Sequence, residues 1–428
     1  MMNRGDTLAK KRLLSNFASL SVLQGANYLL PFITLPYLVR VLGPEKFGLV
    51  AFAQAFIQYF NILTDYGFNL SATREISIHR EDGNELSGIF SAVMMIKLAL
   101  LALSAVIMLC IVFSFGRFYQ QRLVYYYAFG MVAGQCIFPV WFFQGMERMK
   151  YITFLNISAR LIFTVCIFVF VHDVNDYIYV PLINSLGFMT AGILAFVIVF
   201  KDFHVRFTLP SVERIRHQLK EGWHIFISTV AISLYTTSNT FILGLLTNDT
   251  IVGYYSAAEK IIRAVQGLLT PVSQAVYPYV SRLIHTARGE GIRFLRRMTV
   301  MVGGVSFVLS AIIFFSAGII VRLVLGGRYS ESVAVLRILS FLPFVIALSN
   351  IFGIQTMLNL GYKKAFSRIL IGASLLNIVL AFILVPPFRQ TGISFAVLVS
   401  ETVVTVSMFV YLQGRGIRML GGKVCRTI

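Results

Sequence analysis

Residues 88–115 read GIFSAVMMIKLALLALSAVIMLCIVFSF, and their one charged side chain is Lys97. A helix needs about 20 mostly apolar residues to cross a hydrocarbon core of ~30 Å. Backbone groups in lipid must be paired within the segment itself, which excludes irregular and open-sheet structure. This stretch therefore predicts a transmembrane α-helix.

Similar apolar runs recur along the whole chain. Hydrophobic residues make up 57% of the 428 residues and charged residues 13%, with a mean hydropathy of +0.78. Soluble domains carry about 25% charged residues. We therefore expect an all-α polytopic membrane protein of about twelve helices. The predicted spans are 14–38, 47–67, 88–115, 122–144, 151–171, 177–200, 221–246, 252–280, 298–317, 331–357, 369–385 and 391–412.

The net charge of +19 follows the membrane topology. With a cytoplasmic N-terminus, 25 Lys and Arg residues fall in cytoplasmic segments, seven in the opposite segments and five inside spans. This positive-inside asymmetry predicts that both ends of the chain are cytoplasmic. It also accounts for most of the charge without nucleic acid as a partner.

The two halves of the chain resemble each other. With an offset of 205, the second span aligns with the eighth and Gly48 falls on Gly253; with an offset of 211, Gln144 falls on Gln355. Six spans in each half make the halves parallel, an arrangement known from transporters with a central site. We therefore predict an N-lobe of residues 1–210 and a C-lobe of residues 211–428 around a central cavity.

Polar residues form a stripe on one face of the second span. The stripe, at positions i, i+4, i+7 and i+11, consists of Gln54, Gln58, Asn61 and Asp65. The eighth span has an equivalent stripe at the same offset of 205, which consists of Glu259, Arg263, Gln266 and Thr270. This spacing is that of one helix face, and Lys260 lies beside the second stripe. A water-filled cavity would explain both stripes, and so would hydrogen bonds that join helices.

Further charges inside spans are Lys97, Arg160, Arg337 and Glu401. Five basic residues against Asp65, Glu259 and Glu401 give the membrane interior a cationic bias, which suits an anionic substrate. The basic residues could instead reach the interface or pair with carboxylates. Asp65 and Glu259 are candidates to carry a coupling H⁺ or Na⁺, and a fixed salt bridge is the alternative role for either.

Catalytic and metal-binding motifs are missing from the sequence. It contains no GxxxxGK[ST] loop, HExxH or GxSxG motif, and the six histidines and four cysteines have no ligand spacing. We therefore expect a protein that is not an enzyme and that has neither a cofactor nor a metal site.

Three stretches together resemble a known family. They are PYLVRVLG at 36–43 followed by FGL at 47–49, FPVWFFQGMERM at 138–149, and NTFILG at 239–244 followed by GYYSAAEK at 253–260. The chain is thereby similar to Wzx-type O-antigen and polysaccharide-unit flippases, the polysaccharide transport branch of the MOP superfamily, which also contains the MATE transporters.

The resemblance implies a function. Such proteins flip undecaprenyl-diphosphate-linked oligosaccharides from the cytoplasmic to the periplasmic leaflet of the bacterial inner membrane by alternating access. It implies a substrate contact for Lys260, and for Arg40 near the outer exit. The expected partners are this lipid-linked substrate, the bilayer, and an O-antigen polymerase with its chain-length regulator. We expect the cavity to be lined by Lys260, Arg263, Arg160, Lys97, Arg40, Gln54, Gln58, Asn61 and Gln266.

Two other functions fit a polytopic chain. A multidrug/cation antiporter of the same superfamily would favour an anionic cavity, against the basic bias seen here. An O-antigen polymerase or ligase would resemble its relatives in having a large outer loop, whereas the longest predicted outer loop has about 14 residues.

Overall fold

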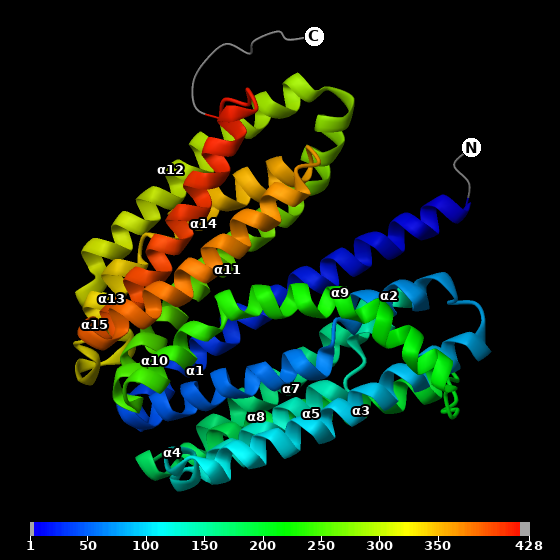
Figure 1. Ribbon diagram of the computed structural model, residues 1–428, viewed down its shortest axis with the longest axis horizontal. Coiled ribbons are helices and arrows are strands. Elements are labelled where there is room, and N and C mark those ends of the chain that lie inside the picture. Colours follow the sequence, from blue (N-terminus) through cyan, green and yellow to red (C-terminus); the bar gives the residue numbers. More distant parts are fainter. Residues whose placement is uncertain (1–3, 420–428) are drawn as a thin grey trace. The chain divides into compact units, whose positions relative to one another are not determined.

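The computed structural model describes residues 4–419, with side chains from residue 30 onward except for residue 31 and parts of 228–236 and 268–275. Every regular element in this range is a helix, as expected (Figure 1). Eight helices in the described residues are long and apolar enough to cross a membrane. The prediction of twelve spans is consistent with this number: Phe32–Ile78 and Lys363–Gly414 each reach into two predicted spans, while the predicted spans 221–246 and 252–280 are not among the eight.

Two long helices contain a break where a loop is predicted. Helix α1 (Arg4–Asp65) is interrupted at Gly43, whose φ of 68° is accessible to glycine without strain. Helix α15 (Lys363–Gly414) is interrupted at Arg389, two residues after the pair Pro386 and Pro387. Each break separates two predicted spans, 14–38 from 47–67 and 369–385 from 391–412.

The chain divides into two compact units, and each is described by itself. Unit 1 comprises Met1–Thr34 and Leu49–Ser233, and unit 2 comprises Leu35–Gly48 and Leu234–Ile428. The units differ from the predicted lobes in two segments, since 35–48 belongs to unit 2 and 211–233 to unit 1. The division into lobes at residues 210 and 211 stays a prediction.

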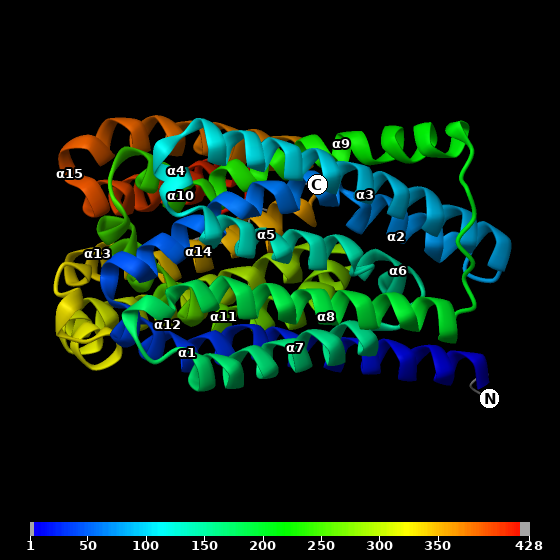
Figure 2. The ribbon, with the colours of Figure 1, turned by 90° about the horizontal axis from the view of Figure 1, so that it is seen from below.

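Unit 1 is a bundle of long helices with short cross-connections. Its main helices are α1 apart from residues 35–48, α3 (Gly83–Ser114), α5 (Arg122–Ile137), α7 (Met149–Phe170), α8 (Tyr179–Asp202) and most of α9 (Val212–Thr236). Helices α5, α7 and α8 pack side by side (Figures 1 and 2). The shorter helices are α2 (Phe68–Ile78), α4 (Gly116–Gln120), α6 (Val140–Gly145) and the 3₁₀ helix η1 (Val174–Ile178).

An aromatic cluster forms one end of the unit 1 core. Trp141, Phe142 and Phe143 of α6 are fully buried, and they pack with Phe90 of α3. The motif at 138–149 therefore contributes mainly to packing. Thr73 of α2 joins this cluster through its hydroxyl, which donates to the Trp141 carbonyl over 3.1 Å.

Unit 2 is built from α10 (Ser238–Leu246), α11 (Asp249–Thr286), α12 (Arg288–Ile320), α13 (Ser332–Leu339), α14 (Leu342–Asn350) and α15. Two π-helical segments, η2 (Val321–Leu325) and η4 (Ile351–Leu358), and the 3₁₀ helix η3 (Gly327–Tyr329) complete it. A core at one end of unit 2 gathers residues of α11, α12, η4 and α15. This core includes Val280, Met298, Phe352 and Met408.

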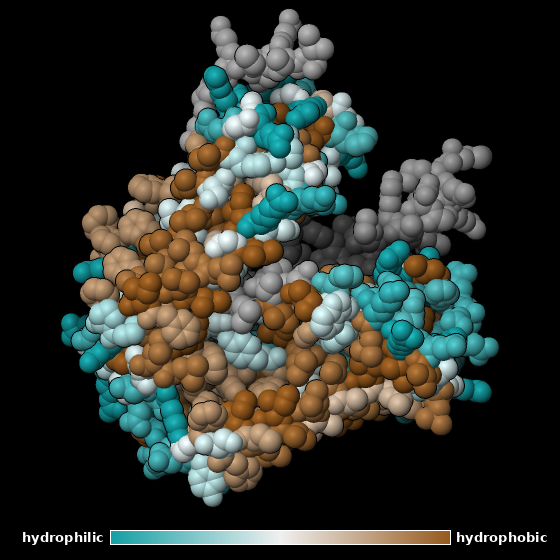
Figure 3. Space-filling view, in the orientation of Figure 1, coloured by the Kyte–Doolittle hydropathy of each residue, from teal (hydrophilic) through white to brown (hydrophobic). Residues whose placement is uncertain are grey.

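Large apolar side chains lie on the outside of the helices. Phe154 is 70% exposed, Val300 67% and Phe315 80%. Figure 3 shows hydrophobic residues over much of the visible surface. Such a surface would be unfavourable in water and is the one that lipid requires.

Candidate functional site

The polar stripe of the second span lies in unit 1, on the part of α1 that follows Gly43. The Asn61 amide donates to the Gln58 side-chain oxygen over 3.3 Å, and the Asn69 amide donates to the Asp65 carboxylate over 2.7 Å. Gln58 is exposed, and the Oδ1 atom of the buried Asn61 has no partner in the described part of the chain. In the described part of the chain, none of the hydrogen bonds of these four residues reaches another long helix. This favours a hydrated face over a face that joins helices by hydrogen bonds.

The stripe of the eighth span lies in unit 2, on α11. The Arg263 guanidinium forms an ion pair with Glu259 at 2.8 Å, with a second hydrogen bond from Nε at 3.1 Å. The Thr240 hydroxyl of α10 donates to the other Glu259 oxygen over 3.4 Å. Two of the three ionisable groups on this face therefore neutralise each other. Gln266 is half-buried on the same helix, and the Thr270 side chain lies outside the described residues.

Lys260 is the third ionisable group of this face, and the opposite charge of Glu259 and the like charge of Arg263 both act on it. Its ammonium lies 4.8 Å from the centroid of the Phe47 ring, a cation–π contact within unit 2. No ion pair of Lys260 is found among the described side chains. An aromatic face attracts an ammonium group without neutralising its charge, so the group keeps its attraction for an anion.

Lys97 and Arg160 are basic residues of unit 1 with no ion pair among its described side chains. Lys97 of α3 is 3% exposed, and its ammonium acts electrostatically on Asp65 without forming an ion pair. Arg160 of α7 is half-buried, and its Nε atom has no hydrogen-bond partner among the residues that the structure describes. Isolated charges in an apolar interior are costly unless a counter-charge is supplied. Each of these groups is therefore suited to bind an anion reversibly.

Arg40 has a structural partner. Its guanidinium donates to the Leu323 carbonyl in η2, and its side chain packs near Gly326. The neighbouring Tyr329 is fully buried with its ring 6.5 Å from that of Phe47, and burial raises the pKa of its phenol. The structure thus shows Arg40 anchoring the segment 321–329, and its expected contact with substrate stays a prediction.

The candidate residues divide between the units. Unit 1 holds Gln54, Gln58, Asn61, Asp65, Lys97 and Arg160. Unit 2 holds Arg40, Glu259, Lys260, Arg263 and Gln266. Within each unit the structure places one polar helix face and at least one basic group that has no ion pair with the described side chains.

Both anchors of the internal repeat are packing contacts. Gln144 accepts a hydrogen bond from Thr73 over 3.4 Å in unit 1, and Gln355 donates to the Ser273 carbonyl over 2.9 Å in unit 2. In the first half, the glutamine therefore connects the fourth span to the segment that follows the second span. In the second half, it connects the fourth span to the second span itself.

Contacts that the sequence did not suggest hold α9 against α2 and α3. Glu75 of α2 accepts hydrogen bonds from His217, at 2.9 Å, and from Gln218. Arg214 pairs with Glu85 of α3 at 2.5 Å. These partners are more than 120 residues apart, so no spacing rule could reveal them.

A cleft of about 390 Å³ also lies in unit 1. The Tyr151 hydroxyl donates to Asp202 in it over 3.0 Å. Its charged lining is balanced, with two arginines and two acidic residues. The lining residues are Arg80, Glu81, Met146, Arg148, Tyr151, Asp202 and Phe203.

Comparison with solved structures shows which known proteins have a fold similar to that of this chain. The lipid II flippase MurJ in an inward closed conformation superposes with a TM-score of 0.68 at 15% identity, over 92% of this chain and 87% of that one. An inward-facing MATE transporter of the MOP superfamily superposes with a TM-score of 0.62 at 14% identity, over 90% and 94%. The predicted all-α fold of this superfamily is confirmed.

Sequence relatives are more similar. A protein of Escherichia coli (strain K12) named "Putative O-antigen transporter" is 37% identical over 94% of this chain and 97% of its own length. A protein of the same name from Shigella dysenteriae is 31% identical over 92% and 98%.

Both sequence relatives are named as transporters, which confirms the expectation that the chain is a transporter rather than an enzyme. The profile of the polysaccharide biosynthesis protein family matches residues 13–284. The chain belongs to the polysaccharide biosynthesis protein family.

Proposed function

We propose that this protein flips a lipid-linked oligosaccharide, an O-antigen or similar repeat unit on undecaprenyl diphosphate, from the cytoplasmic to the periplasmic leaflet by alternating access. The proposal rests on a set of basic residues inside an apolar helical body that have no ion pair with any described side chain. Lys97 and Arg160 supply it in unit 1, and Lys260 supplies it in unit 2. A diphosphate is the counter-charge that these groups fit.

The polar helix faces suit the sugar part of the substrate. Gln54, Gln58 and Asn61 present amides that can donate and accept hydrogen bonds, as hydroxyl groups require. The lipid tail would stay in the bilayer while the sugar passes along these faces. The relatives named as O-antigen transporters support this substrate class, and the MurJ-like fold supports transport of a lipid with a bulky head group.

Asp65, rather than Glu259, would carry the coupling H⁺ or Na⁺. Glu259 is engaged by Arg263 and Thr240, so it is better suited to a fixed salt bridge. Asp65 has one hydrogen-bond donor, Asn69, and the ammonium of Lys97 acts on it from a distance. Arrival of an anion at Lys97 would change the field at Asp65, which is how substrate and H⁺ or Na⁺ could be linked.

The location follows from the same proposal. The protein would lie in the bacterial inner membrane with both ends in the cytoplasm, as its Lys and Arg distribution predicts. An O-antigen polymerase and its chain-length regulator would receive the translocated unit.

Complementation tests the proposal. In a strain that lacks its own flippase for a matching repeat unit, the wild-type chain should restore surface O-antigen. Lys260→Ala should abolish it while the protein still reaches the membrane. The matched control is Arg122→Ala, which removes a cation–π contact of the same 4.8 Å length, to Tyr119, from an exposed position. Full O-antigen with Lys260→Ala would refute the site.

The alternative is a multidrug/cation antiporter, since the MATE neighbours are multidrug resistance transporters. A cationic substrate would meet the same unpaired basic groups and be repelled, which makes this function less favourable. Drug-sensitivity profiles of a strain with and without the chain separate the two functions.

A further inference from the structure

The two units differ sharply in charge at the ends predicted to face the cytoplasm. In unit 2, segments 281–297, 358–368 and 411–419 carry ten Lys and Arg residues and one acidic residue, Glu290. In unit 1, segments 1–13, 68–87, 145–150 and 201–221 carry 13 basic and nine acidic residues. The positive-inside rule concerns Lys and Arg and predicts no difference in acidic residues between the halves. The basic excess of unit 2 therefore needs its own explanation.

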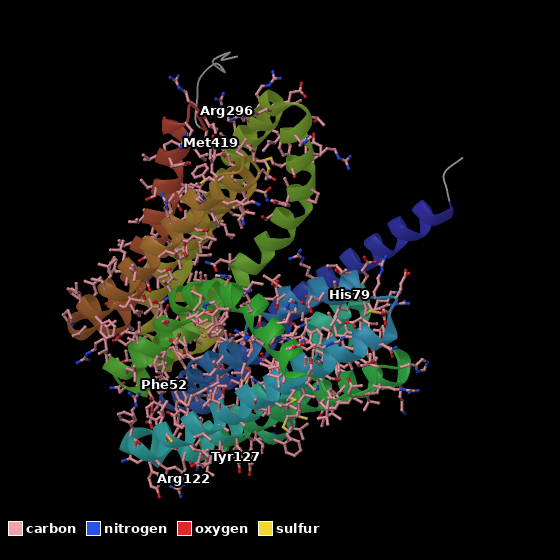
Figure 4. The ribbon with its side chains drawn as sticks, turned by 45° about the vertical axis from the view of Figure 1, so that its right-hand side comes forward. Phe52, His79, Arg122, Tyr127, Arg296 and Met419 are labelled. Carbon is pink, nitrogen blue, oxygen red and sulfur yellow. The ribbon has the colours of Figure 1, made fainter. Side chains whose placement is uncertain are left out.

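The three segments of unit 2 form one surface, called the basic platform below. The Arg296 guanidinium donates to the Arg418 carbonyl, which joins the first segment to the third. The Arg415 guanidinium lies 5.6 Å from the Tyr362 ring and 5.4 Å from the Tyr411 ring, which joins the third to the second. Figure 4 shows Arg296 and Met419 together at this end of unit 2.

Apolar anchors fix the shape of the basic platform. Ile417 is 4% exposed and Met419 0%, and both belong to the hydrophobic core of this end. The alternating residues Arg415 and Arg418 are exposed. The last described turn is therefore held by burial of one set of side chains, while the basic set stays available to a ligand.

Little in the basic platform offsets its charge. Its one ion pair among the described residues, Arg293 with Glu290 at 3.5 Å, has both side chains more than 60% exposed, and such pairs stabilise little. Helix α15 begins with Lys363 and Lys364, has no acidic residue in its first turn and no side-chain cap. Cations at a helix N-terminus are unfavourable, because the helix dipole is positive there. A bound anion would remove this cost.

We propose that the basic platform is the site at which the diphosphate group of a polyprenyl-diphosphate-linked substrate first docks from the cytoplasmic leaflet. This inference rests on the proposed function and extends it to a second, peripheral site. Ordinary anionic phospholipids would be attracted to basic residues of either unit. A cluster of basic side chains with a single acidic residue fits a ligand that carries several negative charges in one group.

Direct binding tests the proposal. The probe is farnesyl diphosphate, a soluble isoprenoid diphosphate, titrated onto the full-length chain in phosphatidylcholine nanodiscs at low and high salt. The variant neutralises four exposed positions of the basic platform: Arg288→Gln, Lys363→Gln, Lys364→Gln and Arg368→Gln. The control removes the same charge from exposed positions of unit 1: Lys150→Gln, Lys201→Gln, Arg206→Gln and Lys220→Gln.

We expect the platform variant to weaken binding about tenfold at low salt and the unit 1 control less than about twofold, with the difference shrinking as salt screens the charges. Equal weakening in both variants, or none in either, would overturn the docking site. Loss of binding only in Lys260→Ala would also overturn it, because the probe would then bind at Lys260 alone.

Two competitors identify the ligand. Dihexanoyl phosphatidylglycerol should compete at least about tenfold less well than the diphosphate, because it carries one charge. Equal competition would assign the surface to phospholipid and refute the diphosphate site, and competition by dihexanoyl phosphatidylcholine would refute any anionic site. Failure of the wild-type chain to translocate substrate would refute the proposed function but would leave these binding results standing.

Discussion

Gly48 and Gly253, which the internal repeat makes equivalent, lie against each other in unit 2. A Cβ atom added to Gly48 would lie 2.6 Å from the Gly253 nitrogen and would overlap the Asp249 carbonyl. A Cβ atom added to Gly253 would overlap the carbonyl of Pro44, the residue that the repeat pairs with Asp249. The contact is therefore reciprocal, as in an interface between identical surfaces related by a twofold axis.

This crossing predicts that neither glycine tolerates a side chain. Gly48→Ala and Gly253→Ala should each destabilise the protein by about 1–3 kcal/mol or more, because the clash is with backbone that cannot rotate away. The readout is thermal unfolding of the detergent-purified protein. The control is Gly304→Ala in α12, where an added Cβ meets nothing within 4 Å. An unchanged melting temperature for both crossing variants would contradict the close approach.

The Glu259–Arg263 pair predicts that exchanging the two charges is tolerated. Glu259→Gln and Arg263→Gln should each lower O-antigen display, because each leaves the other charge unneutralised. The double variant Glu259→Arg/Arg263→Glu should recover at least about half of the display, because i, i+4 pairs form in either order with a modest preference. If the exchanged variant is as inactive as Arg263→Gln, Arg263 contacts the substrate itself.

Replacing Lys97 should affect stability and transport in different ways. Lys97→Met removes a buried charge that lacks an ion pair among the described residues, so the melting temperature should stay the same or rise. Transport should fall by at least about tenfold, because the substrate anion loses the charge that attracts it. A tenfold effect corresponds to about 1.4 kcal/mol. A structural role for Lys97 predicts the reverse, with loss of stability and normal transport in the protein that folds.

Glu75 predicts how strongly α9 is held in unit 1. Glu75→Ala leaves the Gln218 amide, which is 3% exposed, without its acceptor and should cost about 1–3 kcal/mol. Proteolysis in the segment 203–211 between α8 and α9 should then be faster. Glu221→Ala, at an exposed position of the same helix, should cleave at the wild-type rate. Equal cleavage rates for the wild type and both variants would show that the Glu75 hydrogen bonds do not hold α9 in place.

Much of the fold could be predicted because span length and apolar composition leave few choices in lipid. The break at Arg389 lies between two predicted spans, where Pro386 and Pro387 mark it in the sequence. The seventh predicted span is in fact two helices, α9 and α10, separated at Thr237. No proline or glycine marks that break, so the composition of residues 221–246 could not reveal it.

The candidate site could be predicted only as far as helix periodicity reaches. Spacing placed Glu259 and Arg263 on one face, and the structure shows them paired. Spacing could not show that Lys260 faces Phe47, because that contact joins distant segments. The structural role of Arg40 was also hidden, since its partner is a backbone carbonyl 283 residues away.

Translocation in proteoliposomes tests the central claim most directly. A fluorescently tagged undecaprenyl-diphosphate-linked saccharide is distributed over both leaflets, and a membrane-impermeant reagent then destroys the tag on the outside. With the wild-type chain, nearly all of the tag should be destroyed, because lipid from the inner leaflet is delivered to the outer one. With Lys260→Ala, about half should stay protected, the fraction that two equal leaflets give. Protection of half the tag with the wild-type chain as well would contradict the account.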